Sequence, residues 1–316
     1  MMPASSHSLF VSVVICTRNR ASLLRGTLER FLTLTVPSGL GWELLVVDNG
    51  STDTTAQVVT EYATRLPLRG LVEPVTGLSA ARNRAVAEAA GTYVLWTDDD
   101  VLVDQDWLTS FVTAAAKYPR AAAFGGIVEP WFAEPPDQDY VDAFLHLRNG
   151  FCGVDFDAPE GPLEAPHSIV GANMAFRRDA LGTSPFDPDL GFTGDALIGG
   201  EEADLLARIR RSGGQVVWIP SMRVRHYVPR ERMSLGYILR YYEGRGRAAV
   251  RLGGFRQGRR VAGAPLWAVR RLVETGAEWG WARLTGQRVR ALEALAAHHH
   301  LRGVVRQSLI STSNAR

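Results

Sequence analysis

Apolar and polar positions alternate along the first 130 residues in a pattern typical of repeated strand and helix units. Five short apolar runs, rich in β-branched and aromatic residues, predict strands over residues 10–16, 42–48, 70–74, 93–97 and 121–128. Helical patterns begin between these runs, near residues 21, 53, 78 and 104. Because strands that alternate with helices form βαβ units, the pattern predicts an α/β fold with a mainly parallel sheet flanked by helices.

Polar clusters follow three of the predicted strands. "CTRNR" ends the first strand, "DNGSTD" the second and "TDDD" the fourth. In open α/β sheets, ligands bind beyond the carboxyl ends of the parallel strands. We therefore expect these clusters to form one binding site.

The fourth strand runs directly into three carboxylates, Asp98, Asp99 and Asp100. Crowded carboxylates raise one another's pKa and cost stability unless a cation lies among them. In an extended backbone Asp98 and Asp100 point to one side and Asp99 to the other. A pair of carboxylates suits Mg²⁺ or Mn²⁺, which complete their shell with water and substrate phosphates. The alternative is a solvated acidic turn before the next helix, and this segment alone favours neither.

Arginines and turn residues near the other strand ends have two explanations each. Arg82 and Arg84 in "GLSAARNRA" could be solvated charges on a helix, as could other isolated arginines. Together with Arg18 and Arg20, they would place cations where an anionic ligand binds. Asn49-Gly50 is a turn signal, but Asp48 before it is less easily explained by local structure.

Composition is that of a folded protein without an apolar span long enough for a membrane. The chain has 316 residues, of which 46% are hydrophobic and 22% charged, so length allows one large domain or two. Its two cysteines are typical of a reducing compartment. The N-terminal apolar run is too short and strand-like for a signal peptide. We expect a cytoplasmic protein, or one peripheral at the inner face of the cell membrane.

Charge is divided unevenly between the two ends of the chain. Residues 1–221 hold 16 basic and 28 acidic side chains, a balance of −12, whereas residues 222–316 hold 19 Arg and 5 Glu, a balance of +14. Helical stretches over 234–254 and 265–300 place Leu, Val and Trp among these arginines. They could lie on an anionic membrane surface or pack as a helical subdomain. The basic end shows no aromatic stacking motif or helix-turn-helix, so we expect no nucleic acid partner.

Six segments then occur in the order and approximate spacing of the motifs of family 2 glycosyltransferases. They are "VSVVICTRNR", "LLVVDNGSTD", "GLSAARNRA", "WTDDD", "GANMAFRRDAL" and "GGEEADLLARIRRSG". The sequence resembles an inverting, nucleotide-sugar-dependent enzyme of the GT-A fold, over about residues 9–230. The resemblance implies a catalytic domain over residues 1–230 and leaves 231–316 as a basic helical C-terminal extension.

The resemblance also implies a donor site and a metal site. The donor contacts that it implies are Thr17, Arg18, Arg20, Asp48, Arg82, Asn83, Asp98 and Asp99. Asp98 and Asp100 match the family's DxD motif, in which Asp100 is expected to bind the metal directly and Asp98 to lie on the nucleotide side. His226 matches a downstream histidine that can complete the shell of Mn²⁺ or Mg²⁺, although a lone histidine is more often structural.

The catalytic base is expected in "GGEEADLLARI". The family has Glu-Asp where this chain has Glu201-Glu202, so Glu202 corresponds to the base. The additional methylene leaves Glu201 and Asp204 open as alternatives, and acidic residues here could simply stabilise a helix N-terminus. Asn173, together with Asp204, is expected at the floor between donor sugar and acceptor. The irregular stretch 130–166 is long enough for an acceptor loop or lid.

These expectations describe an enzyme that moves a sugar from a UDP-, dTDP- or GDP-sugar to an acceptor hydroxyl. The acceptor could be a glycan, a lipid-linked sugar or a small molecule, as in envelope polysaccharide, glycolipid or secondary-metabolite synthesis. The alternative is a non-catalytic protein that binds a sugar nucleotide or a polyanion. A dehydrogenase is disfavoured because no GxGxxG follows the first strand.

Overall fold

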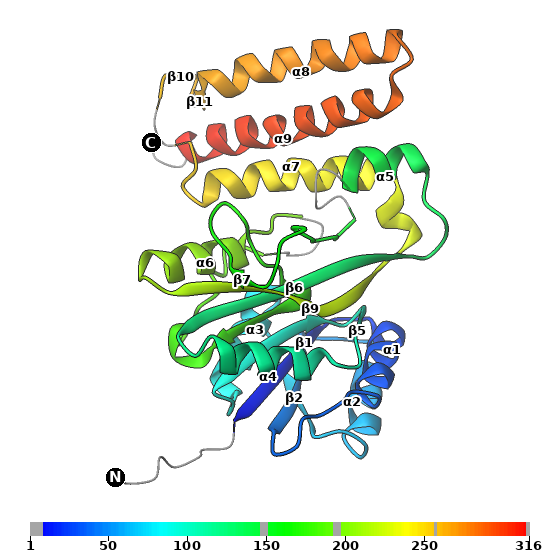
Figure 1. The fold of residues 1–316 in the computed structure, drawn as a ribbon. Helices are drawn as coiled ribbons and strands as arrows, with labels where there is room; N and C mark the ends of the chain where they lie inside the picture. The colour runs from blue at the N-terminus through cyan, green and yellow to red at the C-terminus, as the bar shows by residue number, and fades with distance from the viewer. Residues whose placement is uncertain (1–8, 146–150, 192–196, 256–257, 314–316) are drawn as a thin grey trace. The chain divides into compact units, whose positions relative to one another are not determined.

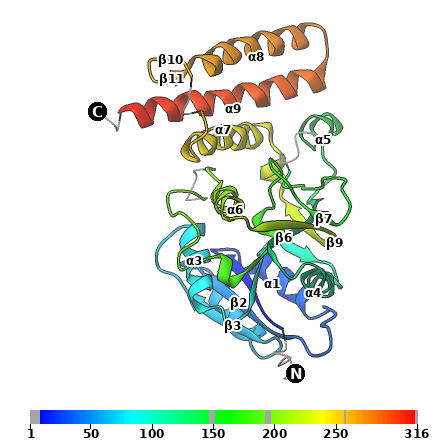
Figure 2. The ribbon, with the colours of Figure 1, turned by 60° about the vertical axis from the view of Figure 1, so that its left-hand side comes forward.

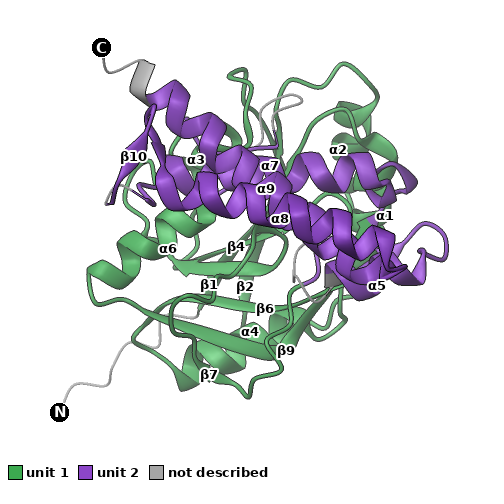
Figure 3. Cartoon of the chain, turned by 90° about the horizontal axis from the view of Figure 1, so that it is seen from above, with its two compact units in different colours: residues 1–129, 154–188, 202–227 green, residues 130–153, 189–201, 228–316 purple. Residues whose placement is uncertain are grey.

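The computed structural model describes residues 9–145, 151–191, 197–255 and 258–313. The chain divides into two compact units, each made of three segments (Figure 3). Unit 1 comprises residues 1–129, 154–188 and 202–227, and unit 2 comprises residues 130–153, 189–201 and 228–316. The boundary expected at residue 230 therefore lies beside the start of the last segment of unit 2, but this unit also includes two earlier segments.

Unit 1 begins with four parallel strands in the order β3-β2-β1-β4. They are β1 (Phe10–Thr17), β2 (Gly41–Asp48), β3 (Leu68–Val72) and β4 (Tyr93–Asp98). The helices that connect them are α1 (Ala21–Phe31), α2 (Thr55–Tyr62) and α3 (Leu78–Glu88). The predicted βαβ organisation is confirmed for this part of the sheet.

The remaining strands extend the sheet with antiparallel pairs, in the order β4-β8-β6-β9-β5 and with β7 beside β9. They are β5 (Val101–Val103), β6 (Ala121–Phe132), β7 (Gly161–Pro162), β8 (Met174–Arg177) and β9 (Gln215–Val228). Two further helices are α4 (Trp107–Lys117) and α6 (Glu201–Arg211). Strand β9 continues through Pro220 and Ser221, which interrupt its apolar run without ending the extended backbone.

Aromatic side chains fill the core between the sheet and its helices. In Figure 2, α3 lies on one side of strands β1 and β2, while α1 and α4 lie on the other. Phe111 of α4 packs edge-to-face on Tyr93 and Phe124, with ring centroids 5.3 and 5.5 Å apart. Each such pair contributes about 0.5–1.5 kcal/mol beyond the burial of its area. The core therefore fixes β4, whose carboxyl end carries the three aspartates.

Some predicted element ends differ from the observed ones by a few residues. Strand β3 ends at Val72, two residues earlier than predicted. Helix α2 runs from Thr55 to Tyr62, so it begins two residues after the predicted start, and residues 63–65 beyond it form turns. Helix α4 begins at Trp107 rather than near Asp104. These ends are set by burial: Tyr62 and Trp107 are buried in the core, whereas the polar residues beyond them are not.

Unit 2 contains four α-helices among its described residues: α5 (Gln138–Leu145), α7 (Leu235–Arg251), α8 (Leu266–Leu284) and α9 (Arg288–Ser313). Figure 1 shows α9 between α7 and α8, and α9 contacts both. The stretch 130–166, expected to be irregular, contains α5 and β7. The helical stretch predicted over 265–300 is two helices, because Gly286 adopts a φ of 71° and turns the chain back.

Glycines allow α7 and α9 to approach closely. A Cβ atom on Gly246 would lie 1.9 Å from the carbonyl oxygen of His300, and one on Gly303 would lie 2.0 Å from that of Glu243. A side chain at either position would push the helix backbones apart. Within the described ranges, no helix combines the length and the apolarity that crossing a membrane requires.

A buried asparagine ties α4 to two strands of the sheet. Asn173 ends a short 3-10 turn (Gly171–Asn173), and its side chain is fully buried. Its Oδ1 accepts a hydrogen bond from Trp107 Nε1 at 2.9 Å. Its Nδ2 donates to the carbonyl oxygens of Ile127, at 2.9 Å, and Met222, at 2.7 Å. Both amide protons and the oxygen are thus used within the protein.

We expect Asn173→Ala to lower the free energy of unfolding by about 3 kcal/mol or more, since it leaves three buried polar partners unsatisfied at roughly 1–3 kcal/mol each. Urea unfolding followed by far-UV circular dichroism measures this loss. The exposed amide Gln105, two residues before Trp107, supplies the control Gln105→Ala, which should change stability by less than about 0.5 kcal/mol. A loss below about 1 kcal/mol for Asn173→Ala would contradict a stabilising role for the three hydrogen bonds of its side chain.

Candidate functional site

The register of the parallel strands brings the predicted polar clusters to one edge of the sheet. Thr17 at the end of β1 lies opposite Asp48 of β2, and its neighbour Cys16 lies opposite Asp98 of β4. The loops after these three strands are therefore adjacent. This is the arrangement that the alternation of strands and helices predicts.

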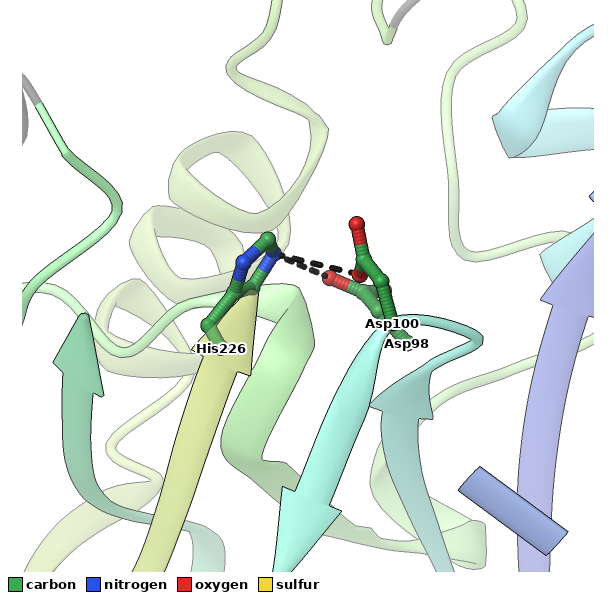
Figure 4. A group of neighbouring side chains, drawn as sticks. All are labelled: Asp98, Asp100 and His226. Carbon is green, nitrogen blue, oxygen red and sulfur yellow. Dashed lines mark ion pairs between the residues drawn. The ribbon is translucent and has the colours of Figure 1, made fainter. Parts of the chain in front are cut away.

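Two of the three aspartates face a histidine of strand β9. His226 Nε2 lies 3.6 Å from Asp98 Oδ2 and 3.4 Å from Asp100 Oδ1 (Figure 4). In the β5–β9 ladder His226 is paired with Val101, and the Tyr227 N–H donates to the Asp100 carbonyl at 2.9 Å. One ligand atom from each residue lies within 4.8 Å of the others, so the group could hold a metal ion.

The donor set fits a divalent cation. His226 Nδ1 lies 3.0 Å from the Tyr227 carbonyl oxygen, which can only accept a hydrogen bond. Nδ1 is therefore a hydrogen-bond donor, so when His226 is neutral its lone pair is on Nε2, the nitrogen that lies nearest to the two carboxylates. Backbone hydrogen bonds of this kind orient metal-binding histidines. Two carboxylate oxygens and one imidazole are ligands that a divalent metal ion can accept together.

A cation that the sequence did not pair with the aspartates lies among them. Arg20 donates from Nη1 to Asp99 Oδ1 at 2.6 Å and from Nη2 to Asp100 Oδ2 at 2.5 Å. The second oxygen of Asp99 accepts from the Thr17 hydroxyl at 2.7 Å. Burial raises the pKa of Asp99 to about 7, although the charge of Arg20 opposes that rise. Thr17 and Asp99, both expected to contact the donor, are thus hydrogen-bonded to each other.

The loops after β1 and β2 are fastened to each other. Asn19 has a left-handed backbone, with φ of 54°, and its N–H donates to Ser51 Oγ at 2.8 Å. Asn19 Oδ1 accepts from the Thr52 N–H at 2.7 Å. Asp48 accepts the Ser51 N–H at 2.8 Å, and Arg18 beside Asn19 is exposed. Sequence reasoning did not single out Asn19, although asparagine's tolerance of positive φ was a usable signal.

A second charged pair joins the arginine of α3 to the start of α6. Arg82 is buried, and its Nη1 donates to Glu202 Oε1 at 3.1 Å. The Gly171 N–H donates to the same oxygen at 3.1 Å. A Cβ atom on Gly171 would lie 1.9 Å from Arg82 Nη2 and 2.8 Å from Glu202 Oε1. Only glycine leaves room for this pair, which the position of Gly171 at the start of "GAN" did not reveal.

Other predicted site residues bond mainly to the protein itself. Both polar groups of the Asn83 amide bond to the backbone of Phe186, at 2.7 and 2.9 Å. Asp204 accepts from Arg208 Nε at 2.8 Å, one helical turn further along α6. Glu201 is only 1% exposed. The contacts of Asn83, Asn173, Asp204 and Glu201 with a ligand stay predictions.

Comparison with known proteins identifies the family. The model of Glycosyl transferase family 2 matches residues 12–181, which is more than half of the chain. The chain belongs to glycosyl transferase family 2. The resemblance predicted from six motifs is confirmed, and with it the prediction of a nucleotide-sugar-dependent glycosyltransferase.

Relatives of this glycosyltransferase carry names that refer to different compounds. It is 27% identical over 241 residues to the succinoglycan biosynthesis protein ExoM of Rhizobium meliloti, covering 74% of this chain and 72% of that protein. It is 31% identical over 175 residues to a PGL/p-HBAD biosynthesis glycosyltransferase of Mycobacterium bovis, covering 54% and 60%. It is 36% identical over 118 residues to validoxylamine A glucosyltransferase of Streptomyces hygroscopicus, covering 37% and 28%.

Solved structures confirm the GT-A fold of this family 2 glycosyltransferase. The mannosyltransferase PcManGT from Pyrobaculum calidifontis, solved with GDP-Man and Mn²⁺, superposes with a TM-score of 0.61 at 20% identity, covering 97% of this chain and 88% of that one. Residues 1–349 of S. aureus TarS, solved with UDP-GlcNAc, superpose with a TM-score of 0.54 at 14% identity, covering 98% and 93%.

Proposed function

We propose that unit 1 transfers a sugar, with inversion, from a nucleotide-diphosphate sugar to an acceptor hydroxyl at the edge formed by β1, β2 and β4. The observation that carries this proposal is the group of Asp98, Asp100 and His226, whose ligand atoms lie within 4.8 Å of one another. These residues would hold a divalent ion, Mn²⁺ or Mg²⁺. When bound, that ion neutralises the charge that develops on the departing diphosphate.

The donor is a UDP-, dTDP- or GDP-sugar in this proposal. PcManGT was solved with GDP-Man and TarS with UDP-GlcNAc, so the fold accepts different nucleotides. The family resemblance assigns base and ribose contacts to the segment from Thr17 to Arg20 and to Asp48, and the β1–β2 register places Thr17 opposite Asp48. Arg18 is exposed in this segment. Arg82 and Asn83 are assigned to the nucleotide side by the same resemblance.

Glu202 is the proposed base. Its carboxylate is held through Oε1 by Arg82 and by the Gly171 N–H, so we assign proton transfer to Oε2. The acceptor oxygen forms a bond to the anomeric carbon while the bond to the diphosphate oxygen breaks and its electron pair leaves with the diphosphate. The acceptor proton passes to Glu202. Burial of Glu201 and the pairing of Asp204 with Arg208 favour Glu202 over these two alternatives.

The acceptor class follows from the relatives' names, which concern succinoglycan, PGL/p-HBAD and validoxylamine A. We propose a glycan, a lipid-linked sugar or a small molecule. A non-catalytic sugar-nucleotide-binding protein is the competing function. It would show metal-dependent donor binding without release of the nucleotide.

A second surface, in unit 2, supports an anionic membrane as a partner. Leu266, Val273, Trp281 and Leu284 of α8 are 43%, 71%, 67% and 85% exposed. Their spacing of 7, 8 and 3 residues places them on one side of the helix, which we call the α8 apolar face. Ala268, Thr275 and Ala282, on the opposite side, are buried. Arg270 and Glu274 lie on the same side of the helix, so the α8 apolar face also carries an exposed ion pair. Exposed apolar side chains that gather on one side mark interaction sites more often than isolated ones do.

Charge supports a membrane as the partner of the α8 apolar face. Unit 2 holds 18 basic and 12 acidic side chains, a balance of +6, and basic residues near anionic lipid contribute about 1 kcal/mol each. Of the tryptophans noted in the sequence, Trp267 packs on Phe255 and Trp279 lies under Arg283, whereas Trp281 is the most exposed of the three. We propose that unit 2 holds the enzyme at the inner face of the cell membrane, where a lipid-linked acceptor is found.

A donor screen tests the metal site. We expect one of the UDP-, GDP- or dTDP-sugars to raise thermal stability with Mn²⁺ present and little without it, since a ligand at about 100 times its Kd adds roughly 2.7 kcal/mol. Asp100→Asn should abolish the Mn²⁺-dependent part, while Asp106→Asn, an exposed aspartate six residues away, should retain it. Equal stabilisation of Asp100→Asn and the wild type would refute the metal assignment.

A second experiment tests the base, using the donor that the screen selects. Glu202→Gln keeps an oxygen for Arg82 and Gly171 but cannot take the proton, so turnover should fall by roughly 10²-fold or more with donor affinity little changed. The turnover of each variant is measured from the rate at which nucleoside diphosphate is released. Glu201→Gln is the matched control and should stay active. An inactive Glu201→Gln with an active Glu202→Gln would assign the base to Glu201.

Vesicle flotation tests the membrane surface. We expect the protein to float with anionic but not neutral vesicles, and to detach at about 1 M salt, where charges are screened beyond about 3 Å. Trp281→Ser with Leu284→Ser should reduce flotation several-fold. Val72→Ser with Val75→Ser, which changes two residues of unit 1 that are each 63% exposed, should not. Flotation unaffected by the α8 changes, or a concentration-dependent dimer that they abolish, would reject the membrane as partner of this face.

A further inference from the structure

One guanidinium bridges two consecutive carboxylates at the metal-binding edge. Arg20 Nη1 bonds to Asp99 and Nη2 bonds to Asp100, at 2.6 and 2.5 Å. The side chains of Asp99 and Asp100 are 3% and 1% exposed, whereas that of Arg20 is 30% exposed. Charge-assisted bonds from a planar fork constrain the orientation of both partners as well as stabilising them.

The bridge uses a different oxygen of Asp100 from the one that faces His226. Arg20 bonds to Oδ2, while Oδ1 lies 3.4 Å from His226 Nε2. Because Arg20 holds Oδ2, the carboxylate of Asp100 cannot rotate freely about its Cβ–Cγ bond, and the direction of Oδ1 is fixed as well. The oxygen presented to His226 and Asp98 is therefore selected by Arg20.

The bridging arginine is itself held at its backbone. Arg20 precedes the first residue of α1, and its carbonyl oxygen accepts the Leu24 N–H at 3.0 Å. The Ala21 N–H next to it donates to Asp53 Oδ2 at 3.1 Å. On its other side, Asn19 is bound to Ser51 and Thr52. The guanidinium thus reaches the aspartates from a backbone that the loop after β2 holds on both sides.

We propose that Arg20 is a positioning residue of the metal site, which orients Asp100 Oδ1 toward the ion and neutralises Asp99. This inference rests on the proposed function. With Arg20 paired to Asp99, the charges of Asp98 and Asp100 match those of one divalent cation. This role differs from the nucleotide contact that the family resemblance implies for Arg20.

The competing account makes Arg20 a like charge that merely weakens cation binding. Removing Arg20 alone would then tighten the site, because Coulomb repulsion disappears. A charge-matched double variant separates the two accounts. Arg20→Gln with Asp99→Asn removes one positive and one negative charge together, and the amide oxygen that the second change introduces can still accept a hydrogen bond from Thr17. The bond from Arg20 to Asp100 is lost in this variant.

The experiment measures Mn²⁺ binding alone, from the electron paramagnetic resonance signal of free Mn²⁺, on the full chain at a temperature where each variant is folded. We expect the double variant to bind Mn²⁺ about 10–100-fold more weakly, as is typical when a partner of a metal ligand is lost. The matched control, Arg25→Gln with Glu61→Gln, removes another arginine–carboxylate pair that involves the same helix, bonded at 2.6 Å, and should leave the Kd unchanged.

The possible outcomes distinguish a failure of the role proposed for Arg20 from a failure of the metal site. One outcome rejects the role of Arg20 but keeps the metal site. In it, the wild type binds Mn²⁺, Asp100→Asn does not, and the double variant binds Mn²⁺ at least as tightly as the wild type. If the wild type binds no Mn²⁺, the metal site and the role of Arg20 both fail. Should the double variant not fold, Arg20→Lys replaces it, because an ammonium keeps the charge but has no planar fork. It too should weaken binding.

Discussion

Mutual repulsion of Asp98, Asp99 and Asp100 is the constraint around which unit 1 is built. Three carboxylates at one strand end are tolerated only where cations or hydrogen-bond donors reach each of them. Arg20 reaches two from the start of α1, Thr17 reaches Asp99 from β1, and His226 faces Asp98 and Asp100 from β9. The strand order brings these elements together, so the antiparallel half of the sheet contributes His226 to a site that the parallel half otherwise builds.

Local pattern and motif order predicted much of this arrangement, because both are carried by neighbouring residues. The βαβ units, the pair of Asp98 and Asp100, and the family were accessible in this way, and so was the start of α6 at Glu201. The pairing of Arg20 with Asp99 and Asp100 was not, because it joins residues about 80 positions apart. Gly171 is a similar case: the need for glycine arises from Arg82 and Glu202, which lie far from it in sequence.

Burial explains where the sequence-based predictions were incomplete. Asn173 was expected at the sugar site from its motif, but its amide is fully bonded to Trp107, Ile127 and Met222. A polar residue in a motif can therefore support the site by holding strands in register. In unit 2, helical periodicity identified the stretches but not the break at Gly286, whose effect depends on α8 and α9 packing against each other.

Chain order and packing order differ in unit 2. Helix α9 follows α7 and α8 in sequence, yet it is the helix that both of them contact. During synthesis, α7 and α8 leave the ribosome before α9, the helix against which both of them pack. The close approach at Gly246 and Gly303 cannot form until that last helix has left the exit tunnel. Domains generally fold as units during synthesis, so this unit completes its core only after α9 has been made.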